Sequence, residues 1–158
     1  MVFDFAPNPG EEPRPLSVIA SGGELSRIYL ALQLAVLAGG PQSGASGGPT
    51  LVFDEVDVGI GGAQAAALGR KLQRLAGGSQ VLVVTHLPQV ASFADHHFKV
   101  AKEVVGERTF TRVDALGPDA RAQEVARMLA GERTTDLSLS HARELIGTAA
   151  EARTAGAG

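Results

Sequence analysis

The apolar residues of this chain change their spacing along the sequence, and the change predicts an α/β fold. Where they recur every three to four positions we expect helices, and short uninterrupted runs predict strands covered on both faces, as in a parallel sheet. These rules predict a helix over 21–38, a strand over 50–53, a helix over 63–75, a strand over 81–84 and a short helix over 88–94. Such alternation is typical of a parallel sheet with flanking helices.

The two ends of the chain and one internal segment carry different patterns. Alternating or β-prone residues around turn signals predict strands, and helical spacing returns near the carboxyl end. The expected elements are a short strand over 1–5, a β-hairpin with strands over 98–105 and 109–113, and helices over 120–130 and 139–150. Five glycines and two prolines predict a flexible loop over 39–49, and 151–158 is expected to be a frayed tail.

Composition predicts a single cytoplasmic domain over residues 1–158. The chain has 158 residues and no cysteine, so neither disulfides nor thiolate metal sites are possible. No apolar run approaches the roughly 20 residues that span a bilayer, and we expect no membrane association. The net charge of -3 gives no global electrostatic reason for nucleic-acid binding, so any contact with DNA would be local.

Two adjacent acids, Asp54 and Glu55, come directly after the predicted strand 50–53. Burying a carboxylate without a partner costs several kcal/mol, so such a pair normally lies beside a cation or an open cleft. In nucleotide hydrolysis one acid orients Mg²⁺ and the other polarises the attacking water. Since consecutive strand residues point to opposite faces, two different roles are expected. The plain alternative is a strand that runs into an acidic loop.

Ser21, Gly22, Gly23 and Glu24 begin the first predicted helix. The spacing of Ser21 and Glu24 is that of a capping box, which alone would be an ordinary helix start. The free N–H groups of the first turn and the positive end of the helix dipole also suit an anion, and the two glycines let a phosphate come close. The segment is therefore a candidate phosphate contact.

His86 and the glycine-rich segment 56–62 complete the candidate chemistry. A histidine that follows a strand is usually a capping or core residue, but here the spacing adds weight. Glu55 comes 31 positions after Glu24, and His86 comes 31 positions after Glu55. Each interval is about the length of one helix plus one strand, so sheet neighbours would present all three residues at one edge. The glycines of 56–62 predict a tight loop, in which Asp57 could orient a group across an interface. The alternative is a plain connection between strand and helix.

In this order, the motifs resemble the carboxyl-terminal lobe of ATP-binding-cassette ATPase heads, and within them the RecN family of SMC-like bacterial DNA-repair proteins. The matching segments are 8–11, 20–27, 53–60 and 84–91. The resemblance implies the α/β fold of an SMC-type ATPase head lobe, with a mostly parallel sheet, flanking helices and a β-hairpin. It also implies ATP and Mg²⁺ as cofactors and a role in DNA double-strand-break repair and recombination, near the nucleoid.

Carried over to this sequence, the resemblance assigns a role to each motif. The roles are a signature that touches ATP on a second head (Ser21, Gly22, Gly23, Glu24), a Mg²⁺-associated acid (Asp54), a general base (Glu55), a D-loop (Asp57, Gly59) and a switch histidine (His86). Many cassette ATPases have an aspartate where Gly61 stands, so no side-chain role is implied there.

The phosphate-binding half of such a site is missing from this sequence. No Gly-x-x-x-x-Gly-Lys-Ser/Thr motif occurs, and the three lysines, at 71, 99 and 102, follow no suitable glycine loop. The resemblance thus implies three partners: an amino-terminal P-loop half of the same protein, a second head in a homodimer, and DNA through the intact protein. We expect no hydrolysis by the chain alone. The alternatives are a catalytically silent interaction module and a fragment of a transporter nucleotide-binding domain.

Overall fold

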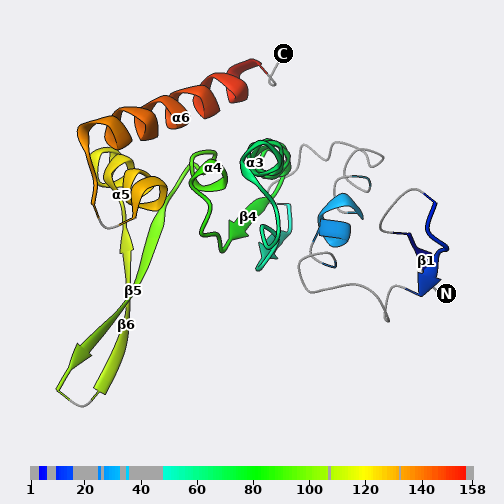
Figure 1. The fold of residues 1–158 in the computed structure, drawn as a ribbon, viewed down its shortest axis with the longest axis horizontal. Helices are drawn as coiled ribbons and strands as arrows, with labels where there is room; N and C mark the ends of the chain where they lie inside the picture. The colour runs from blue at the N-terminus through cyan, green and yellow to red at the C-terminus, as the bar shows by residue number, and fades with distance from the viewer. Residues whose placement is uncertain are drawn as a thin grey trace.

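In the computed structural model of the protein, the described residues are 4–6, 10–15, 25, 27–32, 35, 48–106, 108–131 and 133–155. They form β1 (Asp4–Phe5), β2 (Arg14–Pro15), β3 (Thr50–Phe53), α3 (Gly62–Ala76), β4 (Gln80–Val83), α4 (Pro88–Ala91), β5 (Phe98–Val105), β6 (Arg108–Ala115), α5 (Pro118–Ala130) and α6 (Asp136–Ala155). Residues 27–32 are also helical. Figure 1 shows α3 and β4 in the middle, β1 at one end and the β5–β6 hairpin projecting at the other.

Most predicted elements are confirmed within one to three residues. The pattern missed the extent of two helices. The short helix predicted over 88–94 ends at Ala91. The last helix begins at Asp136 and continues to Ala155, so the expected frayed tail is helical as far as this residue. Contacts hold this helix far along its length, because Gln73 Nε2 donates to the Ala149 carbonyl and Arg153 pairs with Asp95. Residues 16–24, 36–47 and 156–158 lie outside the described residues.

The parallel pair β3–β4 is covered on one face by α3. Leu51 and Phe53 of β3 point to the covered face and are 5% and 2% exposed. They pack in one cluster with the buried face of α3, which consists of Ala65, Leu68, Leu72 and Leu75. The expectation that both faces are buried is wrong for the described chain. Val52 is 59% and Leu82 is 46% exposed, because the sheet here has two strands and one covering helix.

The helix over residues 27–32 is only partly buried. Leu25, Tyr29 and Leu32 have the helical spacing of an apolar face, but these residues are 43%, 43% and 51% exposed. Leu30 is 3% exposed instead and joins the cluster around Phe53. The helix therefore contacts the core through Leu30 and the ring of Tyr29, while about half of the Leu32 side chain stays exposed.

A second cluster joins α5 to α6. Val125, Ala126 and Ala142 form its buried centre. Arg121 of α5 links this pair of helices to α4, because its Nη2 donates to the carbonyl of Ser92 at 2.9 Å. α4 lies next to α3, where Gly69 leaves room for the ring of Phe93 just after α4. The two clusters are thereby held in one unit (Figure 1).

The β5–β6 hairpin has one charged and one apolar face. Its antiparallel register pairs Val100 with Val113 and Ala101 with Arg112, so cross-strand partners alternate between the two faces. The apolar face carries Phe98, Val100, Val104 and Val113, all more than half exposed. On the charged face, Arg112 pairs with Glu103 and Asp114. The predicted hairpin is confirmed, and one of its faces is uncovered in the described chain.

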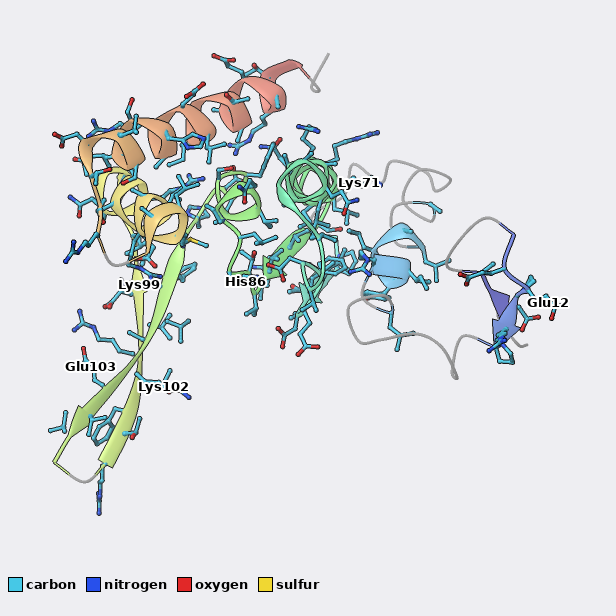
Figure 2. All side chains as sticks on the ribbon, viewed as in Figure 1. Glu12, Lys71, His86, Lys99, Lys102 and Glu103 are labelled. Carbon is cyan, nitrogen blue, oxygen red and sulfur yellow. The ribbon has the colours of Figure 1, made fainter. Side chains whose placement is uncertain are left out.

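Lys99 ties the base of the hairpin to α5. Its Nζ lies 2.7 Å from Oε2 of Glu124, and Arg127 Nη2 lies 2.6 Å from Oε1. Figure 2 shows Lys99 near α5, with Lys102 and Glu103 further along the strands. Hydrogen bonds from Arg127, and then from Lys99, lower the pKa of Glu124 to about 2, although desolvation by burial raises it. This buried carboxylate therefore stays charged in the folded chain.

We predict that Glu124→Gln lowers the free energy of unfolding by about 1 to 3 kcal/mol at neutral pH, because charge-assisted hydrogen bonds are lost. Since the pKa of Glu124 is depressed on folding, its contribution is full above the unfolded value near 4.5 and disappears as the pH falls toward 2. Urea unfolding of both proteins between pH 7 and pH 3 measures this difference. The control is Glu103→Gln, which removes one carboxylate of an exposed ion pair on the hairpin. A difference in unfolding free energy between the wild type and Glu124→Gln that stays constant with pH would contradict the prediction.

Candidate functional site

The parallel pairing of β3 and β4 brings their carboxyl ends together. Phe53 lies opposite Val83, and the Val84 N–H donates to the Phe53 carbonyl at 2.9 Å. The residues that follow each strand therefore leave from the same edge. In an open parallel sheet this edge is where ligands bind. The structure thus brings Glu55 and His86 to one side, together with Asp54, whereas Glu24, the third residue of the predicted spacing, lies outside the described residues.

Asp54 and Glu55 lie in a bend after β3, not in the strand itself. Strand alternation therefore does not separate their side chains, contrary to the expectation. Among the described residues, Glu55 is the only non-glycine residue with a positive φ, 57°. A residue with a side chain is strained when its backbone adopts this left-handed conformation, and such strain is concentrated at functional sites. The geometry singles out Glu55 from its neighbour.

The segment 56–59 is the predicted tight loop, and it turns inward at Asp57. The Val58 N–H donates to the Glu55 carbonyl at 3.2 Å, and Gly59 has a φ of 75° that a glycine adopts without strain. Val56 is fully buried in the cluster beneath the sheet. Asp57 is 3% exposed, so its carboxylate faces the protein interior. This burial argues against the expected contact of Asp57 with a ligand or across an interface.

The Asp57 carboxylate is satisfied by the residues that follow β4. Thr85 Oγ1 donates to Asp57 Oδ2 at 2.5 Å, and the backbone N–H of His86 donates to the same oxygen at 3.2 Å. His86 Nδ1 lies 3.4 Å from this oxygen, while 73% of the histidine side chain is exposed. Figure 2 shows His86 next to β4, just below α4. Thr85 was missed as a site residue, although its position directly before His86 was a usable signal.

The helix over residues 27–32 lies against this loop. Arg27 Nη1 donates to the Val58 carbonyl at 2.7 Å, and the ring of Tyr29 lies 5.6 Å from that of Phe53, between centroids. The helix that follows the candidate signature is therefore attached to the same sheet edge. The signature itself, Ser21, Gly22, Gly23 and Glu24, lies outside the described residues, so its predicted role stays a prediction.

In the parts of the chain that the structure describes, no group of three or more histidine, aspartate or glutamate side chains could hold a metal ion together. None of the described helices is both long enough and apolar enough to cross a bilayer.

The fold resembles that of SMC ATPases. A solved structure from work on the ATP-driven dimerization and DNA-stimulated activation of SMC ATPases matches with a TM-score of 0.50. The match covers 78% of this chain and 70% of the other, at 19% sequence identity. At this identity the similarity concerns the fold alone. The arrangement of helices and short sheets is that of an SMC-type ATPase lobe.

Sequence comparison identifies the family, although no protein-family model matches the chain. The chain is 51% identical to the DNA repair protein RecN of Deinococcus radiodurans over 146 residues, which are 92% of the chain and 24% of the relative. It is 43% identical to RecN of Bacillus subtilis over 154 residues, 98% of the chain and 26% of the relative. The chain belongs to the RecN family, and it spans about a quarter of the length of these relatives.

We predict that Glu55→Gly stabilises the 158-residue chain by about 0.5 to 1 kcal/mol, because glycine adopts a positive φ without the penalty of a side chain. Asp54→Gly is the matched control. It should destabilise by at least a similar amount, since the φ of Asp54 is not positive, glycine there adds entropy to the unfolded state, and the contact of the Asp54 side chain is lost. Urea unfolding of both variants measures the two effects, and equal destabilisation would contradict a strained backbone at Glu55.

Proposed function

We infer that this chain is the carboxyl-terminal head segment of a RecN-type ATPase that acts in DNA double-strand-break repair and recombination. The observation that carries the inference is the meeting of Glu55 and His86 at one edge of the β3–β4 sheet, in a fold similar to that of SMC ATPases. A carboxylate on a strained backbone and an exposed histidine at the same sheet edge form a suitable arrangement for activating water next to a phosphate. Such a role places the protein in the cytoplasm, at the nucleoid.

In this proposal each residue has one task in ATP hydrolysis. Glu55 is the general base that takes a proton from the attacking water, and His86 contacts the terminal phosphate. Ser21, Gly22 and Gly23 contact ATP held by a second head, with Glu24 capping their helix. Gly59 allows the loop to approach the opposite head closely. Asp57, being buried, is not a ligand contact in this scheme.

The donor set of this chain fits a shared Mg²⁺ site. Asp54 is exposed at the end of β3, and one carboxylate is what a nucleotide-bound Mg²⁺ commonly takes from a protein, since phosphates and waters complete its octahedron. The lack of a larger ligand cluster in the described residues agrees with such sharing. When bound, Mg²⁺ would neutralise charge on the phosphates of ATP. Asp54 would hold it, and the P-loop half would supply the rest.

Three uncovered apolar faces support a missing partner within the same protein. These are the outer face of β3–β4 (Val52, Leu82, Val84), one face of the hairpin (Phe98, Val100, Val104, Val113) and the helix residues Leu25, Tyr29 and Leu32. Contiguous exposed apolar surface of this kind marks an interaction site. We assign the outer face of β3–β4 to the amino-terminal P-loop half, because added strands and helices there would complete a sheet buried on both faces.

The hairpin offers little support for DNA binding by this segment itself. Lys99 is paired with Glu124, and Arg112 with Glu103 and Asp114. Lys102 belongs to the opposite face of the hairpin, since its cross-strand partner is Thr111. Of the four basic residues that could line one side of the hairpin, Lys99, Lys102, Arg108 and Arg112, two are therefore in ion pairs, and Lys102 lies on the other face from Arg108 and Arg112. We assign DNA binding to the intact protein.

Glu55→Gln in the full-length protein tests the proposed function. We expect ATP turnover to fall by at least about 100-fold, because the amide cannot accept a proton from water. ATP binding should be retained, since the shape of the side chain is unchanged. Steady-state hydrolysis and equilibrium binding of ATP measure the two properties.

The control for this experiment is Glu103→Gln, an exposed carboxylate on the hairpin that should leave turnover unchanged. A wild-type protein that does not hydrolyse ATP, or a Glu55→Gln variant with full turnover, would contradict the ATPase assignment. Either result would favour an interaction module without catalysis.

The double variant Val52→Ser, Leu82→Ser tests the assigned interface. With the P-loop half and this chain expressed as separate polypeptides, we expect association to weaken by at least about tenfold, because burial of each side chain contributes roughly 1.5 to 3 kcal/mol. A titration of one half with the other measures the affinity. Leu137→Ser is the control, since Leu137 is 80% exposed on α6. Equal affinities for both variants would contradict the assignment.

A further inference from the structure

Asp57 and Thr85 form a buried link between the two loops of the candidate site. Asp57 Oδ2 accepts a hydrogen bond from Thr85 Oγ1 and another from the His86 backbone N–H. Thr85 Oγ1 in turn accepts one from the Leu87 N–H at 3.0 Å. Two side chains therefore fix three consecutive residues after β4. A buried carboxylate is costly unless it is hydrogen-bonded, and here these donors satisfy it.

This link also orients the imidazole of His86. Nδ1 lies 3.4 Å from Asp57 Oδ2, so the carboxylate favours a proton on this nitrogen. Nε2 is then left as the nitrogen that can meet a ligand. A carboxylate behind a functional histidine commonly sets its tautomer and ring orientation. Since most of the histidine side chain is exposed, the Asp57 contact is the main restraint on it among the described residues.

The loop that carries Asp57 is itself anchored on both sides. The Val58 N–H binds the carbonyl of Glu55, and the Val58 carbonyl accepts the hydrogen bond from Arg27. The loop that carries Asp57 is therefore hydrogen-bonded to the strained Glu55 through Val58, and the Asp57 carboxylate contacts the exposed His86. A displacement of this loop would change the position of the histidine.

We propose that Asp57 is a positioning residue, which with Thr85 holds the His86 backbone and ring in place relative to Glu55 and does not touch nucleotide. The proposal rests on the ATPase function inferred above. It replaces a ligand contact by Asp57, which the D-loop position suggested, with an internal role. The inference is carried by the 3% exposure of Asp57 and by its contacts with the Thr85 hydroxyl, the His86 backbone N–H and the His86 Nδ1.

The decisive variants are Asp57→Asn and Thr85→Val, with Thr85→Ser as the conservative rescue. In the full-length protein we expect Asp57→Asn and Thr85→Val each to lower kcat about tenfold, with KM for ATP unchanged, because the histidine is misplaced but binding is not. Thr85→Ser keeps the hydroxyl and should restore most of kcat. The double variant should be no worse than the worse single variant, since both weaken the same link: Asp57→Asn removes its charge and Thr85→Val removes its hydroxyl.

Amide hydrogen exchange in the 158-residue chain gives a second measurement that needs no ATP hydrolysis. We expect faster exchange at His86 and Leu87 in Thr85→Val, with unchanged exchange in α3, and normal exchange in Thr85→Ser. A raised KM at unchanged kcat would show a ligand contact and overturn the proposal, as would unchanged exchange at both amides. If the wild-type protein does not hydrolyse ATP, the proposed function fails, and the exchange data alone decide whether the link holds His86.

Discussion

The parallel pairing of β3 with β4 is the interaction on which the rest of this structure depends. It sets Phe53 opposite Val83, so the segments that follow the two strands leave the sheet side by side. The packing of Leu51 and Phe53 on α3 maintains this register, because a shift by one residue would move the apolar side chains to the other face. Without this register, Asp57 would not reach Thr85 and His86.

Burial is one-sided in this chain, and that asymmetry connects the fold to its function. α3 covers the inner face of β3–β4, whereas Val52, Leu82 and Val84 remain exposed on the outer face. The hairpin repeats the arrangement, with a charged face in ion pairs and an apolar face uncovered. The chain spans about a quarter of the length of its relatives, and exposed apolar surface of this kind marks interaction sites in proteins.

The site combines a strained residue with a buried polar link. Glu55 adopts a positive φ just after β3, and Asp57 turns inward two residues later. Hydrogen bonds from Thr85 and His86 satisfy the Asp57 carboxylate and tie the loop that follows Glu55 to the segment that follows β4. The same loop thus carries the proposed general base and restrains the proposed switch histidine.

The sequence by itself determined the local elements and the identity of the chemical groups. Spacing of apolar residues is a local property, so α3, β3, β4 and the hairpin were predicted within a few residues, and the motifs placed Asp54, Glu55 and His86 at strand ends. Tertiary structure decided which faces are covered, the inward direction of Asp57, the partnership with Thr85 and the ion pairs of Lys99 and Arg112. These depend on contacts between residues far apart in the chain, such as the 28 positions between Asp57 and Thr85, which no local pattern records.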